Sequence, residues 1–140
     1  MDNDIKRSII LDNYEDARNR MIPENTEGYV VINSNNQSCI DNINIYLKIN
    51  NDKIEDVKFD GEACVIAIAS TSILSEMLIG KTVDEAKEIL RNYFNMIEEE
   101  DYNKDILGDA NAFCDMYKQP SRKTCATLFA RGINNYFNNK

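Results

Sequence analysis

The stretch that decides the fold is INIYLKINNDKIEDVKFDGEACVIAIASTSILSEMLIG, at residues 43–80. Over residues 43–49 apolar and polar side chains alternate, which is the period of a strand with one buried face. Asn50-Asn51-Asp52 predicts a hairpin turn into a further strand over residues 53–59. The small, apolar run at residues 63–79, closed by Gly80, predicts a helix buried against these strands.

The residues before this stretch add one helix and one strand. A helix over residues 4–17 is predicted by apolar side chains at helical spacing, namely Ile5, Ile9, Ile10 and Tyr14. Pro23 and Gly28 predict a loop after this helix. Residues 29–32 favour a strand, and residues 33–38 predict a polar turn. The three strands predict an antiparallel meander with one apolar face.

The residues after this stretch are predicted to be helical. Thr82 and Glu85 fit a capping box before an apolar helical face, and the acidic residues 98–101 predict an exposed segment. Pro120 marks a break before a final helix at residues 125–137, with Cys125 in its first turn. We therefore predict one domain, residues 1–140, of α+β class, with helices packed on one side of a three-stranded antiparallel sheet.

Composition excludes several kinds of function. The net charge is -8 and the pI is near 4.6, which argues against nucleic-acid binding. No stretch approaches the roughly 20 apolar residues of a membrane span, and the first residues are acidic, unlike a secretory signal. We therefore expect a cytoplasmic protein without membrane contact. The absence of histidine excludes Ser-His-Asp hydrolysis and histidine-ligated zinc.

The four cysteines raise the question of metal binding or thiol chemistry, because disulfides are rare in a reducing compartment. Cys39 and Asp41 are two residues apart, so their side chains can project to the same side of an extended chain. Antiparallel pairing brings Cys64 close to Cys39. If the last helix docks at the same edge, Cys125 completes a four-ligand set that suits Zn²⁺.

A second reading of these residues is purely structural. Free cysteines usually pack in cores, and a lone aspartate most often serves a turn or a helix cap. Cys114, between Phe113 and Met116, keeps this structural interpretation.

The charge of the predicted site must also be compensated. Predicted helix N-termini at Cys64 and Cys125 favour the thiolate form. Three thiolates and a carboxylate around Zn²⁺ leave a formal charge of about -2. We expect Arg122 and Lys123 to supply the compensating cations.

Three motifs stand out: residues 36–41, Tyr14 with Ala17-Arg18-Asn19, and residues 54–64 followed by residues 67–72. Together they resemble motifs of the NifU/IscU-like family of iron-sulfur cluster assembly proteins. The segment from Asn36 to Asp41 resembles the family's Asn-Pro-x-Cys-Gly-Asp loop, and Tyr14 with Ala17-Arg18-Asn19 resembles its Tyr-x-x-Pro-Arg-Asn segment. Residues 54–64, followed by the Ser-rich residues 67–72, are similar to the family's third strand, second cysteine and helix.

The segment from Glu98 to Ser121 resembles the insertion of the SUF-type, SufU-like branch. Thr124 stands where the other branch carries a histidine and the SufU-like branch usually carries a lysine. Ile40 replaces the family's glycine.

The resemblance implies a zinc site at Cys39, Asp41, Cys64 and Cys125. It also implies a pyridoxal-phosphate-dependent cysteine desulfurase as partner within the iron-sulfur assembly machinery. In this hypothesis docking frees Cys39 from the metal to accept persulfide sulfur, so the chain acts as a zinc-dependent, sulfurtransferase-like protein. A scaffold that assembles a transient [2Fe-2S] cluster on the same ligands is the alternative. A binding module with a purely structural zinc is a third hypothesis.

Overall fold

The sheet has three antiparallel strands, as predicted, in the order β1 (Val30–Asn35), β2 (Asn42–Asn50) and β3 (Lys53–Glu62). The computed structural model describes residues 1–36 and 40–139. The inward residues of β2 that carry the alternation, Ile43, Ile45 and Leu47, are fully buried. The sequence period therefore identified the buried face of the central strand correctly.

Strand β1 begins one residue later than predicted and continues through Asn35, into residues expected to form a polar turn. Asn33 pairs with Asn44 in the register, and the Asn33 Nδ2 donates to the Oδ1 atoms of Asn42 at 2.7 Å and Asn44 at 3.1 Å. These cross-strand amide bonds offset the low strand propensity of asparagine.

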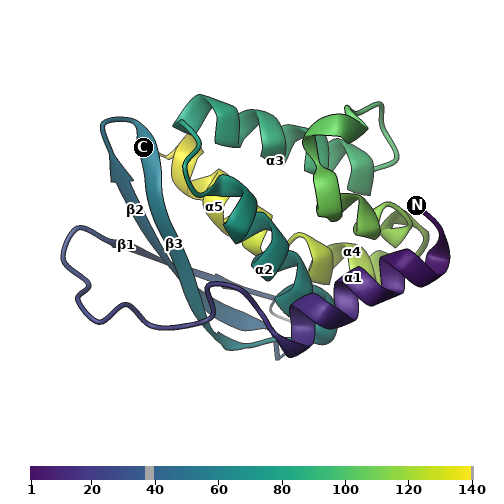
Figure 1. The fold of residues 1–140 in the computed structure, drawn as a ribbon, viewed down its shortest axis with the longest axis horizontal. Coiled ribbons are helices and arrows are strands. Elements are labelled where there is room, and N and C mark those ends of the chain that lie inside the picture. Colours follow the sequence, from purple (N-terminus) through teal and green to yellow (C-terminus); the bar gives the residue numbers. More distant parts are fainter. Residues whose placement is uncertain (37–39, 140) are drawn as a thin grey trace.

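Helices gather on one side of the sheet (Figure 1), with α2 (Val65–Leu78) and α5 (Leu128–Asn138) against the strands. Helix α1 (Asn3–Glu15) packs on α2, and α3 (Val83–Ile97) packs on α5. The predicted capping box at the start of α3 is present in both directions between Thr82 and Glu85. The predicted α+β architecture is confirmed.

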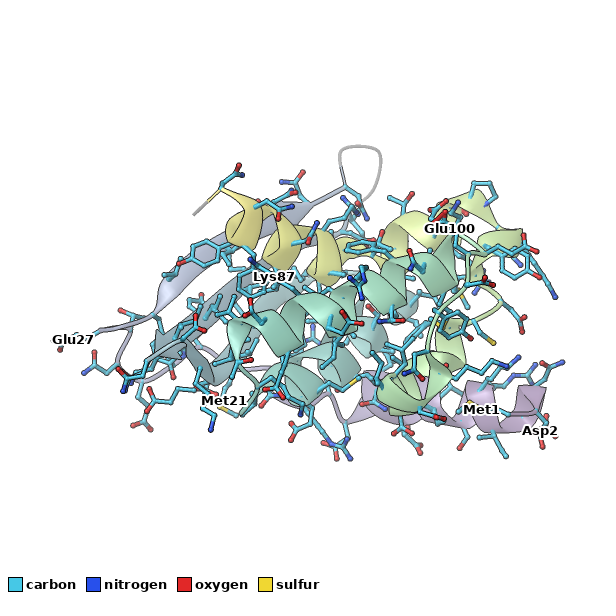
Figure 2. The ribbon with its side chains drawn as sticks, turned by 90° about the horizontal axis from the view of Figure 1, so that it is seen from above. Met1, Asp2, Met21, Glu27, Lys87 and Glu100 are labelled. Carbon is cyan, nitrogen blue, oxygen red and sulfur yellow. The ribbon has the colours of Figure 1, made fainter. Side chains whose placement is uncertain are left out.

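The segment between α3 and α4 (Pro120–Ala126) consists of short 3-10 helices: η1 (Lys104–Ile106), η2 (Gly108–Phe113) and η3 (Met116–Lys118). The acidic residues 98–101 are exposed, as predicted. Figure 2 shows Glu100 in this segment and Lys87 on α3, while Glu27 and Met1 lie at opposite ends of the molecule. No described helix is both long enough and apolar enough to span a membrane.

The C-terminal region differs from prediction, because two helices replace the single expected helix. Pro120 stands at the first position of α4, where its missing N–H costs nothing, so that helix begins five residues before Cys125. Thr127 then separates α4 from α5. Cys125 consequently lies in the last turn of α4 and not in the first turn of a helix.

Candidate metal centre

Three of the four predicted ligands come together at one end of the sheet. One ligand atom each from Asp41, Cys64 and Cys125 lies within 4.8 Å of the other two. These residues come from the start of β2, the start of α2 and the end of α4, so long-range folding produces the group. The fourth predicted ligand, Cys39, lies outside the described residues.

The pairing of β2 with β3 places Asp41 beside Cys64. Asn42 pairs with Glu62, so the residue before β2 and the residues after β3 share one edge. The Asp41 side chain is 1% exposed, and its Oδ1 accepts the backbone N–H of Cys64 at 2.8 Å. Its Oδ2 lies 3.8 Å from Cys64 Sγ. The two side chains thus present sulfur and oxygen toward a common point.

Cys64 is the N-cap of α2, as the sequence predicted. Its Sγ accepts the backbone N–H of Ala67 at 3.5 Å. This bond places the sulfur at the helix N-terminus, beside the partial positive charge of the helix. Cys64 is therefore in the setting expected for a metal-binding sulfur.

The prediction of the same setting for Cys125 is wrong, because Cys125 lies near the C-terminal end of α4. Burial, followed by hydrogen bonding with Cys64 and Asp41, raises the pKa of the Cys125 thiol far above its ordinary value. Without a cation, the thiol is the stable form here. A bound metal ion would reverse this preference, because it stabilises the thiolate.

Buried hydroxyls fix the junction between α4 and α5, directly after Cys125. The Ala126 carbonyl accepts hydrogen bonds from Ser70 Oγ at 2.8 Å and from the Tyr93 hydroxyl at 2.7 Å. The Leu128 carbonyl accepts Ser34 Oγ at 2.7 Å. Since a break between helices frees carbonyl groups, the two bonds to Ala126 satisfy the carbonyl next to Cys125, and the bond to Leu128 ties the start of α5 to β1. Together they support the position of Cys125 in the group.

The expected cations Arg122 and Lys123 are directed elsewhere. Lys123 forms an ion pair with Glu98 at 2.9 Å, and Arg122 is exposed. Within residues 1–36 and 40–139, no hydrogen bond or ion pair joins either side chain to Asp41, Cys64 or Cys125. Neither side chain therefore neutralises the negative charge of these three residues through direct contact.

Arg131, from α5, is the cation that lies close to the group. Burial lowers the pKa of this guanidinium, while the nearby Cys125 and Asp41 raise it. Sequence reasoning missed Arg131 because no spacing rule links it to a ligand. The available signal was that Arg131 is the only charged residue between Lys123 and Lys140.

Cys114 is separate from the metal-binding group and is half-buried against the core, in line with its structural interpretation. Its thiol lies beside Lys6, whose Nζ bonds Asp115 at 2.6 Å.

The donor set fits zinc. Two cysteine sulfurs and one carboxylate oxygen are typical ligands of a tetrahedral Zn²⁺ site, which takes four donors. One further donor would complete the set, and that Cys39, two residues before Asp41, supplies it stays a prediction.

Residues 5–126 match the NifU-like N-terminal domain family. The chain belongs to this family. A relative from Bacillus subtilis, the zinc-dependent sulfurtransferase SufU, is 34% identical over 123 residues, which cover 87% of this chain and 82% of SufU. The iron-sulfur cluster assembly scaffold protein IscU of Streptococcus pyogenes is 34% identical over 103 residues, covering 73% of this chain and 65% of IscU.

A crystal structure of SufU from Fervidobacterium islandicum supports the same family membership. That protein, described as a scaffold for the SUF system, superimposes with a TM-score of 0.85 at 32% identity and covers 96% of this chain and 97% of its own. The NifU-like protein of Brucella abortus, at 20% identity and a TM-score of 0.81, shares the fold. The resemblance stated from the motifs, including the SUF-type branch, is confirmed.

Proposed function

We propose that this chain is an iron-sulfur cluster assembly protein that accepts persulfide sulfur on Cys39 and passes it on. A zinc site made of Cys39, Asp41, Cys64 and Cys125 serves this reaction. The observation that carries the proposal is the convergence of Asp41, Cys64 and Cys125 from three separate segments. The name of the B. subtilis relative, a zinc-dependent sulfurtransferase, supports this use of the group.

The sulfur donor in this proposal is a cysteine desulfurase, which holds the pyridoxal phosphate. The Cys39 thiolate attacks the terminal sulfur of a persulfide on the donor's cysteine. One S–S bond forms at Cys39 while the donor's S–S bond breaks, and the donor cysteine leaves as a thiolate that takes up a proton. The step transfers sulfur without net oxidation or reduction.

Cys39 is the acceptor because the other two sulfurs are held in place. Cys64 caps α2, and Cys125 is fixed by the bonded junction between α4 and α5. Cys39 stands in a polar stretch of sequence, and its neighbour Ile40 is 76% exposed. Polar loops on a rigid scaffold are the usual place for reactive groups.

Zinc would supply stabilisation of the thiolate form of its cysteine ligands at neutral pH. The chain supplies the rest: Cys64 N–H orients the Asp41 carboxylate, and the bonded junction between α4 and α5 keeps Cys125 close to both. The third hypothesis, of a purely structural zinc, gives Cys39 no reaction to perform.

The test measures desulfurase turnover with and without the zinc-loaded chain in iron-free buffer, followed by intact-mass analysis. The proposal expects faster turnover and an added sulfur that is lost in Cys39→Ala. Cys114→Ala is the matched control, because this cysteine lies outside the metal-binding group. If Cys39→Ala gained sulfur at the wild-type rate, the assignment of Cys39 as the acceptor would be disproved.

The second candidate function is a scaffold for a [2Fe-2S] cluster, favoured by the similarity to IscU, an iron-sulfur cluster assembly scaffold protein. Cysteine-rich sites can hold iron and sulfide on similar ligands. In that case the desulfurase rate would not change, and a visible chromophore would form anaerobically when iron, sulfide and the metal-free chain are mixed.

A further inference from the structure

The guanidinium of Arg131 ties helix α5 to two other parts of the chain. Its Nη2 donates to Asn36 Oδ1 at 2.5 Å and to the Thr124 carbonyl at 2.9 Å, while its Nε donates to Thr127 Oγ1 at 3.1 Å. Asn36 follows β1, and the two threonines flank Cys125. A rigid, planar fork is suited to holding several acceptors at fixed angles.

Asn36 carries this contact onward to the ligand Asp41. Its Nδ2 donates to Asp41 Oδ2 at 3.1 Å, and its backbone N–H donates to the Asp41 carbonyl at 3.0 Å. Both side chains are buried, with exposed fractions of 6% for Asn36 and 1% for Asp41. Asp41 is therefore held on one carboxylate oxygen by Asn36 and on the other by Cys64 N–H.

The donors and acceptors of Arg131, Asn36 and Asp41 allow only one orientation of the Asn36 amide. Arginine can only donate, and an ionised carboxylate can only accept. Placed between them, the Asn36 amide must direct its oxygen to Arg131 and its NH₂ group to Asp41. Removing the arginine removes the contact that determines this orientation.

We propose that Arg131 is a positioning residue of the metal centre, which acts through Asn36 to fix the Asp41 carboxylate as a ligand. Its hydrogen bonds go to Asn36, Thr124 and Thr127, not to Asp41, Cys64 or Cys125 directly. Outer contacts of this kind orient ligands and commonly change metal affinity by about 10- to 100-fold. The Arg131 guanidinium also joins Thr124 and Thr127, near Cys125, to Asn36, just after β1. The segments that carry Cys125 and Asp41 are therefore held by the same side chain.

This inference rests on the metal site of the proposed function, but the test measures metal binding alone. Zinc dissociation constants are measured by chelator competition for wild type, Arg131→Gln, Asn36→Ala and the double variant. We expect each single variant to bind zinc about 10- to 100-fold more weakly. Because both act along one path, the double variant should lose no more than the larger single loss. Arg91→Gln, an exposed arginine on α3 paired with Glu88, is the matched control.

Arg131→Lys separates position from charge, because lysine keeps the charge and loses the planar fork. We expect it to bind zinc more weakly than wild type. We also expect the visible spectrum of the cobalt-loaded Arg131 and Asn36 variants to change, since that spectrum reports ligand geometry. Wild-type affinity in Arg131→Lys would show that charge alone matters and would overturn the proposal.

Two further outcomes would also overturn it: zinc affinity in Arg131→Gln equal to that of Arg91→Gln, or losses that add fully in the double variant. If Arg131→Gln does not fold, Arg131→Lys and Asn36→Ala still decide the question. A wild-type chain that binds no zinc would instead remove the proposed function, which is a different result.

Discussion

The Asp41 carboxylate accepts the backbone N–H of Cys64 at 2.8 Å, so two of the proposed metal ligands hold each other in place. The bond joins the residue before β2 to the N-cap of α2, across the edge where β2 and β3 meet. Part of the site geometry is consequently built into the fold. Metal binding therefore requires little rearrangement of the backbone between Asp41 and Cys64.

Replacing Asp41 should affect metal binding more than any other single change outside the cysteines. Asp41→Ala removes a ligand and leaves Cys64 N–H without its acceptor, so zinc affinity should fall by more than about 100-fold, beyond the usual effect of an outer contact. The measurement is chelator competition with the purified variant.

Asp41→Asn is the matched comparison, because it keeps the shape and one oxygen. Its new NH₂ group would face the Asn36 NH₂ group if its oxygen stayed on Cys64, so we expect weaker zinc binding than wild type despite the conserved size. Equal affinity of wild type and Asp41→Asn would show that carboxylate charge contributes nothing.

Tyr93→Phe tests the hydroxyl support of the junction after Cys125. The variant keeps the buried ring and removes one of the two donors to the Ala126 carbonyl, which still accepts Ser70. We expect a loss of about 1 kcal/mol in the free energy of unfolding, the usual net value of one hydrogen bond. Urea unfolding measures it, with the exposed Tyr14→Phe as control. An unchanged midpoint would contradict the supporting role.

Gly61→Ala should disturb the end of β3, three residues before Cys64. Gly61 has φ +120°, and an added Cβ would lie 2.3 Å from the Asn42 carbonyl oxygen. We expect a loss of about 2 kcal/mol or more in unfolding free energy, from backbone strain plus the clash. Gly80→Ala, at φ +87° with nothing within 4 Å, carries the strain without the clash and should cost less. The reverse order in urea unfolding would refute the argument.

The ion pair between Lys6 and Asp115 should make stability depend on pH. The hydrogen bond from Lys6 lowers the pKa of Asp115 below its ordinary value of 3.8, and the bond to Asp115 raises the pKa of Lys6 above 10.5. Asp115 therefore stabilises the fold fully above pH 3.8 and loses this effect as pH falls through its lower folded pKa. Lys6 loses its contribution as pH rises through its folded value, above 10.5.

Asp115→Asn should accordingly reduce stability at neutral pH by roughly 0.2–1 kcal/mol, the range of partly exposed pairs. The difference from wild type should shrink as the pH falls below 3.8. Denaturant unfolding at several pH values checks this, with the exposed Asp109→Asn as control. A difference that persists unchanged at the lowest pH would rule out the ion pair as its cause.

Local sequence signals predicted the sheet and the first part of the site, because they depend on short-range physics. Alternation at residues 43–49 identified the central strand. Antiparallel pairing was expected to bring Cys64 close to Cys39, which lies outside the described residues; the structure shows Cys64 beside Asp41, two residues further along. The helix break at Thr127 could not be read in the same way. It depends on buried hydroxyls from Ser34, Ser70 and Tyr93, which arrive through tertiary packing.

The two cations predicted for the site bond none of the ligands that the structure describes, for a related reason. Arg122 and Lys123 are close to Cys125 in sequence, but α4 directs Lys123 to Glu98. Arg131 reaches the group from α5 because Gly132 allows that helix to approach β1, where a Cβ would lie 3.0 Å from Ser34 Cβ. Proximity in the chain was a poor guide to proximity in the fold.

Removal of zinc should weaken the fold without abolishing it. The core is built from β2, β3 and the helices, and none of its buried hydrophobic residues, such as Leu90 and Phe129, is itself a proposed metal ligand. The metal-free chain should therefore keep its helical circular dichroism and a cooperative unfolding transition. The midpoint of that transition should rise when zinc is added, as binding to the native state requires.

A chain that unfolds completely with chelator would instead support the structural-zinc hypothesis, because the metal would then be a condition of folding. Cys125→Ser separates the two cases: it should reduce the zinc-dependent rise in the midpoint while leaving the metal-free transition close to that of wild type.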